Sequence, residues 1–133
     1  MKKHIQVAAA LLFENGKIFA TKRGDSRYAY VAHKFEFPGG KIEENEIPEN
    51  ALKREILEEL NVKISVGEHL YTVEYDYPKF HLSMKCYICS LIDENIELKE
   101  HSAAKWLAIS ELDTVDWLPA DIEVVGIIKK YKF

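Results

Sequence analysis

Three glutamates, Glu55, Glu58 and Glu59, lie close together in a segment predicted to be a helix over residues 48–60. At about 100° of rotation per residue they fall within an arc of about 100°, so the three carboxylates share one helix face. Clustered oxygen ligands are what a hard divalent cation requires, whereas a solvated acidic face is the alternative interpretation. No Lys or Arg follows four residues after them inside the helix, so we expect their repulsion to be unrelieved on this face.

Two further features place this acidic face in the fold. Leu52, Ile56 and Leu60 form an apolar stripe beside the glutamates, which predicts that the helix packs on a core. Upstream, the extended segment 35–40 ends in Gly39 and Gly40, where the backbone can approach a ligand closely. Both features favour a site built where the glycines meet the helix.

The spacing of these residues resembles a known signature, the Nudix box of the Nudix hydrolase superfamily. Five residues separate Gly40 from Glu46, seven more lead to Arg54-Glu55, and the remaining matches are Ile56, Glu58, Glu59 and Val62. The departure is Asn61 where the family has glycine, and asparagine tolerates the left-handed conformation of a helix end. Ile47 is a poor helix cap, which costs about 1 kcal/mol relative to Thr or Ser.

Segments outside the box extend the resemblance over nearly the whole chain. The segment 36–41 is similar to the MutT-like nucleoside triphosphate pyrophosphohydrolases, which include 8-oxo-dGTP diphosphatases. Glu100-His101, six residues before Trp106, and the segment 118–122 are similar to the CTP pyrophosphohydrolase branch. The resemblance implies an α/β Nudix fold, a mixed β-sheet sandwiched between α-helices. It also implies Mg²⁺-dependent hydrolysis of a nucleoside triphosphate to a monophosphate and pyrophosphate, as in nucleotide sanitation, with Mn²⁺ as the alternative ion.

The resemblance also implies roles for the residues of the box. Glu58 and Glu59 are expected to be metal ligands, Glu55 a ligand or the base that orients water, and the Gly39 carbonyl a further ligand. Arg54 is expected to act in the catalytic centre by holding Glu55 or the loop. Glu46 is expected to be a structural partner of that loop.

Three charged residues outside the helix are candidates for the same site. Glu100 matches a loop glutamate of MutT-like enzymes, which makes it a candidate metal ligand or general base, although loop glutamates are commonly only solvated. His101 is a weaker candidate. Lys41 beside the glycines and Arg23 at the end of a strand are candidates for binding phosphate oxygens, with solvated surface positions as the alternative.

The base-binding residues are predicted from aromatic side chains and one acid. Phe35, Tyr75 and Phe80 are candidates for stacking on a base, although strand aromatics commonly belong to the core, and Phe37 is a further candidate for binding the substrate. Asp121 matches the helix start at which MutT-like enzymes read the base. A carboxylate only accepts hydrogen bonds, so it suits an amino group such as that of cytosine, or the N1–H and N2–H₂ edge of guanine. Its alternative role is the N-cap of the last helix.

The remaining elements are predicted from turns and periodicity. Asn15-Gly16 predicts a hairpin between strands 4–13 and 17–23. Further strands are expected over 68–77, 81–92 and 104–108, and a capping box at 110–113 predicts a helical turn. Apolar residues Ile122, Val125 and Ile128 predict an amphipathic helix over 121–132.

Composition limits the class of protein. The chain has 133 residues, 47% apolar, and a net charge of −4, which suits a single domain over 1–133. Because the charge is negative, we expect no nucleic-acid partner. No segment approaches the roughly 20 apolar residues of a membrane span, so we expect a cytoplasmic protein, monomeric or homodimeric, without a membrane partner.

Cys86 and Cys89 are three residues apart in a strand, on opposite faces, which favours two separate thiols over a shared metal or disulfide.

Two alternatives to the expected hydrolysis of a nucleoside triphosphate remain open at this point. Within enzymes, a nucleotide-sugar or dinucleotide hydrolase is the alternative. A Nudix module that binds a nucleotide without hydrolysis is the other, and such a module is expected to lack box carboxylates.

Overall fold

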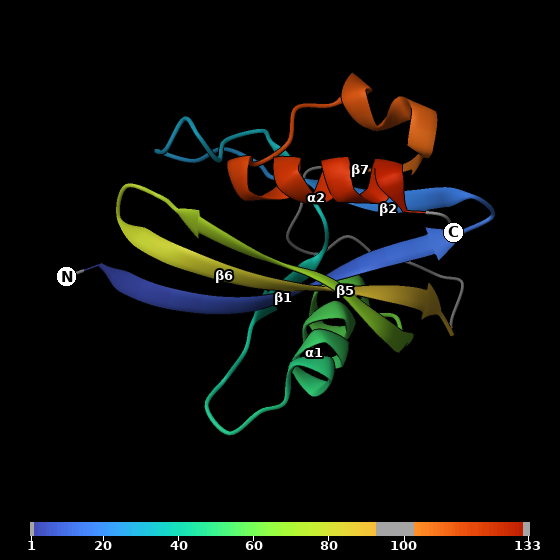
Figure 1. Cartoon of the computed structure of the whole chain (residues 1–133), viewed down its shortest axis with the longest axis horizontal. Coiled ribbons are helices and arrows are strands. Elements are labelled where there is room, and N and C mark those ends of the chain that lie inside the picture. Colours follow the sequence, from blue (N-terminus) through green and yellow to red (C-terminus); the bar gives the residue numbers. More distant parts are fainter. Residues whose placement is uncertain (1, 93–102, 132–133) are drawn as a thin grey trace.

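The computed structural model describes residues 2–92 and 103–131 and folds them in layers (Figure 1). The strands are β1 (Lys3–Glu14), β2 (Lys17–Lys22), β3 (Phe35–Glu36), β4 (Gly39–Lys41), β5 (Ile64–Asp76), β6 (Phe80–Leu91) and β7 (Ala103–Ala108). The helices are α1 (Pro48–Leu60), a 3₁₀ helix η1 (Ile109–Thr114) and α2 (Pro119–Lys130). Mixed strands between two helices confirm the predicted fold class.

Strand β1 is the centre of the sheet because it pairs with three other strands. Its first part runs parallel to β6 and antiparallel to β4, and its last residues pair with β2. Strand β6 continues antiparallel to β5, and β2 continues antiparallel to β3 and β7. The parallel pairing of β1 with β6 brings residues about 77 positions apart side by side, as the register Lys3 with Phe80 shows.

Alternation along β1 gives each face of the sheet its own core. Ala8, Ala10 and Leu12 pack with α1, whereas Ala9 and Leu11 pack in the core that includes α2. Figure 1 shows α1 and α2 on opposite sides of the sheet. The site elements are therefore held from both faces of one strand.

The predicted hairpin and the predicted acidic helix are confirmed. Asn15 and Gly16 have φ of 52° and 77°, as a type I′ turn needs, and Phe13 pairs with Ile18. Helix α1 begins and ends where predicted, and Asn61 at φ 56° donates its backbone N–H to Leu57 O at 3.0 Å. Ile47 provides no side-chain cap, as expected.

Four predictions about these elements are wrong: two concern bounds, one a packed face and one a cap. Strand β5 begins at Ile64, four residues before the predicted start, because pairing with β6 extends it. Helix α2 runs over Pro119–Lys130 rather than 121–132, since Pro119 suits the first helical position. Ile122 is 60% exposed, because Val124, Val125 and Ile128 supply the packed face instead. Helix η1 follows Ala108, whose backbone N–H donates to Glu111 Oε1 at 2.8 Å, so Ser110 is not its cap.

The two cysteines lie where the strand period predicts. Cys86 and Cys89 are free and buried in different cores, one on each face of β6. Burial raises the pKa of both thiols, which keeps them protonated. Among the residues that the structure describes, no helix is long and apolar enough to cross a bilayer.

Candidate active site

Helix α1 presents its glutamates because its apolar stripe fixes its rotation. Leu52, Ile56 and Leu60 are fully buried against the sheet, which turns the adjoining acidic face toward β4 and solvent. The three carboxylates are exposed to different degrees: the Glu55 side chain is 17% exposed, Glu58 is 59% exposed, and Glu59 counts as buried.

Arg54 connects this face to the loop before the helix. Its guanidinium donates to both carboxylate oxygens of Glu46 at 2.8 and 2.9 Å, to Glu55 Oε1 at 2.9 Å and to the Lys41 carbonyl at 3.0 Å. It also lies 3.5 Å from Glu58 Oε2. The expectation of unrelieved repulsion is therefore wrong, because Arg54 supplies positive charge from four residues before Glu58 rather than four residues after it.

The pairing of Arg54 with Glu46 fixes both charges. Hydrogen bonds from Arg54 and from the Glu43 backbone lower the pKa of Glu46 to about 2, and the same pair raises the pKa of Arg54. Charge-assisted bidentate pairs of this kind hold geometry as well as charge. The loop 43–46 is thereby fixed to α1, as expected for Glu46.

The two glycines of β4 allow it to fit between β1 and α1. A Cβ on Gly39 would lie 2.0 Å from the Ala8 carbonyl oxygen, and a Cβ on Gly40 would lie 2.3 Å from the Glu55 carboxylate. Neither position has room for a side chain. The glycines thus bring the Gly39 backbone and the Glu55 carboxylate into one place, as their predicted role in close approach requires.

The donor set of the box fits a hard divalent cation. Glu55, Glu58, Glu59 and the Gly39 carbonyl offer oxygen atoms only, which is the ligand type that Mg²⁺ and Mn²⁺ prefer. Within the described part of the chain, these three carboxylates are not already gathered into a group of converging ligand atoms. Arg54 contacts Glu55 and Glu58 in this arrangement and occupies part of their ligand capacity.

A cleft of about 640 Å³ opens beside these residues. Nine residues singled out from the sequence line it: Arg23, Phe37, Gly39, Gly40, Lys41, Glu55, Glu59, Phe80 and Asp121. Four others do not line it: Phe35, Arg54, Glu58 and Tyr75. Phe35 is a core residue that packs against Trp117, and Tyr75 lines a separate hollow with Tyr77 and Pro78. The stacking role predicted for Phe35 and Tyr75 is therefore not supported.

The basic residues of the cleft differ in their partners. Arg23 forms an ion pair with Glu36, with 2.9 Å between Nε and Oε2, and half of its side chain is exposed. Glu36 also lines the cleft. Lys41 is exposed at the glycine end of the cleft, where its side chain can reach an anion beside the box carboxylates.

Sequence reasoning missed the aromatic wall of the cleft. Tyr77 stacks on Phe80 at 4.9 Å between ring centroids and on Tyr30 at 5.5 Å, and all three line the cleft. The Tyr77 hydroxyl accepts the Ala120 backbone N–H at the start of α2, and burial raises the pKa of Tyr77 to about 12. No local signal marks Tyr77, which reads as part of a turn. Its role depends on the meeting of β5 and α2.

Asp121, at the start of α2, lines the cleft and is only 2% exposed. Burial, reinforced by the Glu36 carboxylate, raises the pKa of Asp121 well above its usual range, while the Phe37 backbone and Arg23 act in the opposite direction. Asp121 is not the N-cap of α2, since that position is Leu118. A raised pKa favours the protonated form, and a protonated carboxyl group both donates and accepts, so the acceptor-only argument holds for Asp121 only when it is ionised.

Glu100 and His101 lie outside the described residues, so their predicted roles remain predictions. The structure does bring most of the other candidates to one cleft. The box carboxylates and glycines come from α1 and β4, whereas Asp121 comes from α2 on the other side of the sheet (Figure 1). This layout offers anion binding, cation binding and base recognition along a single path.

Comparisons with known proteins show the family of this chain. The NUDIX domain family matches residues 2–125. The chain is 32% identical over 129 residues to an 8-oxo-dGTP diphosphatase of Escherichia coli K12, covering 96% of this chain and 98% of that protein. It is 29% identical over 123 residues to the CTP pyrophosphohydrolase of the same organism, covering 92% and 90%.

A solved structure supports the fold along the full length. The solution NMR structure of the DNA mismatch repair protein MutT (family Nudix hydrolase) from methicillin-resistant Staphylococcus aureus 252 superposes with a TM-score of 0.75. It is 39% identical and covers 98% of both chains. The chain therefore belongs to the NUDIX domain family and is a MutT-like Nudix hydrolase, an enzyme that acts on phosphoric anhydride bonds.

Proposed function

We propose that this enzyme cleaves a (deoxy)nucleoside triphosphate, of the CTP or dCTP type or oxidised 8-oxo-dGTP, to the monophosphate and pyrophosphate. The observation that carries the proposal is that one cleft joins the box residues Gly39, Glu55 and Glu59 to the buried acid Asp121. A triphosphate and its base need an anion site and a base site at opposite ends of such a path. The 8-oxo-dGTP diphosphatase and CTP pyrophosphohydrolase relatives support this substrate class.

Mg²⁺, with Mn²⁺ as the alternative, is the proposed cofactor. Glu55, Glu58, Glu59 and the Gly39 carbonyl would hold it, because they supply the oxygen donors that the ion prefers. When bound, such an ion neutralises charge on the phosphate oxygens and lowers the pKa of a water ligand. Glu55 is proposed to orient the attacking water, and Arg54 to position Glu55 through their 2.9 Å contact.

The remaining cleft residues are proposed to bind the substrate. Arg23 and Lys41 lie where they can contact phosphate oxygens, and Phe80 with Tyr77 offers an aromatic surface for the base. Phe37 packs 4.6 Å from Trp117 between ring centroids, which fixes the wall next to Asp121. Asp121, as a neutral acid, can donate to N3 of cytosine and accept from its N4 amino group.

A substrate screen with product identification tests the proposal. We expect CTP, dCTP, 5-methyl-dCTP or 8-oxo-dGTP with Mg²⁺ to give a monophosphate and pyrophosphate. Preferred hydrolysis of ADP-ribose or of a diadenosine substrate would replace the proposal with the nucleotide-sugar or dinucleotide alternative. Tight nucleotide binding without any product would indicate a non-catalytic module and would overturn the proposal.

The role of Glu100 is tested in the same assay. As a ligand or general base, Glu100 changed to Gln lowers kcat by about 100-fold or more and alters its pH profile. Glu44→Gln is the matched control, because Glu44 is an exposed loop glutamate away from the cleft lining. Unchanged pH profiles for Glu100→Gln would assign Glu100 to the solvated surface.

A further inference from the structure

A second group of ligand-type side chains lies outside the residues that line the cleft. His4 on β1 is paired in register with His81 on β6, and Glu74 on β5 lies opposite Ser83 of β6. None of the three ligand-type side chains lines the cleft, and His4 lies on the face of β1 that carries Ala8 and Ala10. This cluster is therefore separate from the proposed hydrolase site.

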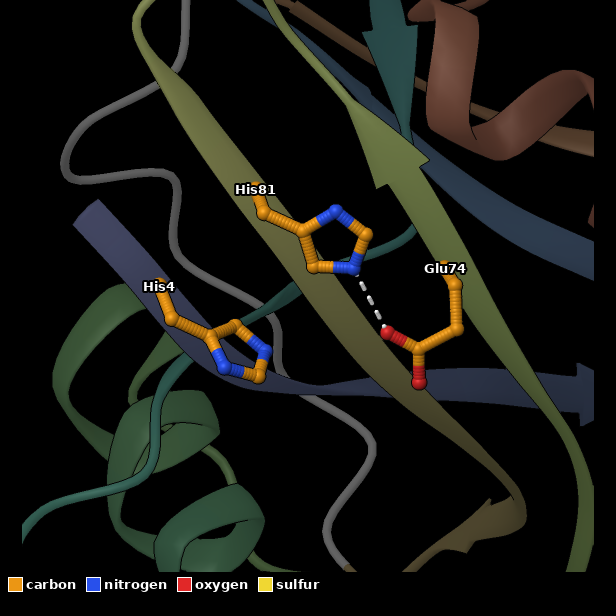
Figure 2. A group of neighbouring side chains, drawn as sticks. All are labelled: His4, Glu74 and His81. Carbon is orange, nitrogen blue, oxygen red and sulfur yellow. Dashed lines mark hydrogen bonds and ion pairs between the residues drawn. The ribbon is translucent and has the colours of Figure 1, made fainter. Parts of the chain in front are cut away.

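The three side chains converge on one point (Figure 2). One ligand atom from each of His4, Glu74 and His81 lies within 4.8 Å of the other two. His81 Nε2 is 2.9 Å from Glu74 Oε1, and the two imidazole rings lie 5.1 Å apart between centroids. In a tetrahedral site with bonds of about 2.0–2.2 Å, ligand atoms are roughly 3.3 Å apart. Small side-chain rotations are enough to reach that spacing.

The surrounding residues hold the ligands as outer partners of a metal site do. Asp76 Oδ1 lies 2.9 Å from His81 Nδ1, which leaves Nε2 to face the cluster. The Ser83 hydroxyl lies 2.7 Å from His4 Nε2 and donates to Glu74 Oε1. A carboxylate on the second nitrogen of a ligating histidine fixes its orientation and raises its basicity.

We propose that His4, Glu74 and His81 form a binding site for a transition-metal dication of the zinc class. Two imidazole nitrogens and one carboxylate are a donor set that suits Zn²⁺, Ni²⁺ or Co²⁺, whereas Mg²⁺ favours oxygen donors. Three protein ligands leave a fourth position for water. Because the ligands come from β1, β5 and β6, the bound ion links three strands at one end of the sheet. It therefore stabilises the folded chain.

Protons compete with the metal at this site. The acidic side chains that face His81 are Glu74 and Asp76 on β5, each 2.9 Å from one of its ring nitrogens, and Lys2, just before β1, lies 3.6 Å from Asp76. A protonated His81 cannot ligate a metal. We therefore expect Zn²⁺ to bind more tightly at pH 8 than at pH 6.

Calorimetric titration of the full chain with Zn²⁺ tests the site, together with the thermal midpoint with and without the metal. Both are measured in a Glu58→Gln, Glu59→Gln background with excess Mg²⁺, so that binding at the box is not counted. We expect one Zn²⁺ per chain and a higher midpoint. We also expect at least a tenfold loss of affinity in His4→Gln and in His81→Gln, and a loss of about 10–100-fold in Asp76→Asn.

The matched control is His69→Gln, because His69 lies on β5 outside the cluster and its ring contacts Thr72 instead. It is expected to keep the Zn²⁺ affinity of its parent. The visible spectrum of the Co²⁺ complex gives a second readout that is independent of stability, and it should lose its intensity in His4→Gln and His81→Gln only. Equal affinity of all variants, or no rise in thermal midpoint with Zn²⁺, would overturn the proposal.

Discussion

The two ends of the cleft use the same chemical group in opposite ways. At the α1 end, Glu46 and Glu55 are paired with Arg54, and the pKa of Glu46 falls to about 2. At the α2 end, burial raises the pKa of Asp121 well above its usual range. The first end therefore favours charged carboxylates beside a cation, and at the second end burial favours the neutral form of the acid.

This difference follows from how each end is built. The α1 end comes from one helix and the loop directly before it, so its partners are close in sequence and partly solvated. Asp121 is surrounded by Phe37, Tyr77 and Cys86, which come from three other parts of the chain. Local pairing allows a carboxylate to stay charged, whereas enclosure by distant elements removes its water.

The largest expected effect is at the charged end. Glu58→Gln and Glu59→Gln each remove a charged oxygen ligand while keeping size, so we expect kcat to fall by about 100-fold or more. Steady-state assays at limiting Mg²⁺ measure it, with Glu44→Gln as the control for removing an exposed glutamate. The thermal midpoint without metal should hold or rise, since clustered negative charge is relieved. Near-normal turnover by Glu58→Gln would contradict the site as described.

A second test changes the pairing that keeps the α1 end charged. Arg54→Gln removes the donors to Glu46, Glu55 and Lys41, so we expect the thermal midpoint at pH 7 to fall by roughly 3–6 °C and kcat to fall with it. Arg54→Lys should restore part of the stability but not the bidentate geometry. A kcat that recovers fully in Arg54→Lys would show that charge alone is needed.

The pH dependence of that stability loss has a definite sign. Because the pKa of Glu46 is lowered from 4.5 to about 2 in the folded chain, its pairing stabilises the fold above pH 4.5. That contribution is lost as pH falls through 4.5 toward 2. The free energies of unfolding of the wild type and Arg54→Gln, measured with denaturant, should therefore differ most above pH 5 and converge near pH 2. A constant difference across this range would contradict the ion-pair explanation.

A third test concerns the protonation state of Asp121. Asn is the uncharged isostere of a protonated Asp, so Asp121→Asn should keep the ratio of kcat/KM for CTP and UTP within about threefold, whereas Asp121→Leu should lower kcat/KM by about tenfold or more. A tenfold narrowing of the ratio in Asp121→Asn, equivalent to about 1.4 kcal/mol, would show instead that Asp121 is ionised when the base is bound.

The stability of the same variants gives an independent measure of the protonation state. The pKa of Asp121 is raised in the folded chain above its ordinary value of 3.8. The stability that Asp121 contributes is therefore fully present below pH 3.8 and is lost as pH rises through the folded pKa. Asp121→Asn does not titrate. Its stability relative to the wild type should therefore increase with pH in denaturant unfolding, and an unchanged difference would indicate a solvated, charged Asp121.

The smallest expected effect is at the start of α1. Ile47 occupies the cap position with extended backbone angles of −78° and 148° but offers no side-chain acceptor. Ile47→Thr should stabilise the chain by about 1 kcal/mol and leave kcat unchanged, because the side chain lies on the surface away from the carboxylates. Ile47→Val, which offers no acceptor, is the control. A change in kcat with Ile47→Thr would mean that α1 moves when it is capped.

Local patterns in the sequence determined most of the α1 end. The helix bounds, the left-handed Asn61, the approach of Gly40 to Glu55 and the link from Arg54 to Glu46 all depend on residues within about 20 positions of one another, and the spacing of the Nudix box fixes them. The geometry of a helix and a tight turn follows from the chain itself, so such features can be predicted from residue types and intervals.

Only the tertiary structure decided the Asp121 end of the cleft and the cluster of His4, Glu74 and His81. That Tyr77 caps α2 depends on contacts 43 positions apart, and the pairing of His4 with His81 depends on the parallel register of β1 and β6. The protonation of Asp121 depends on how deeply α2 buries it, which no interval in the sequence specifies. Burial and strand register are set by the packing of distant elements, and residue spacing carries no direct measure of either.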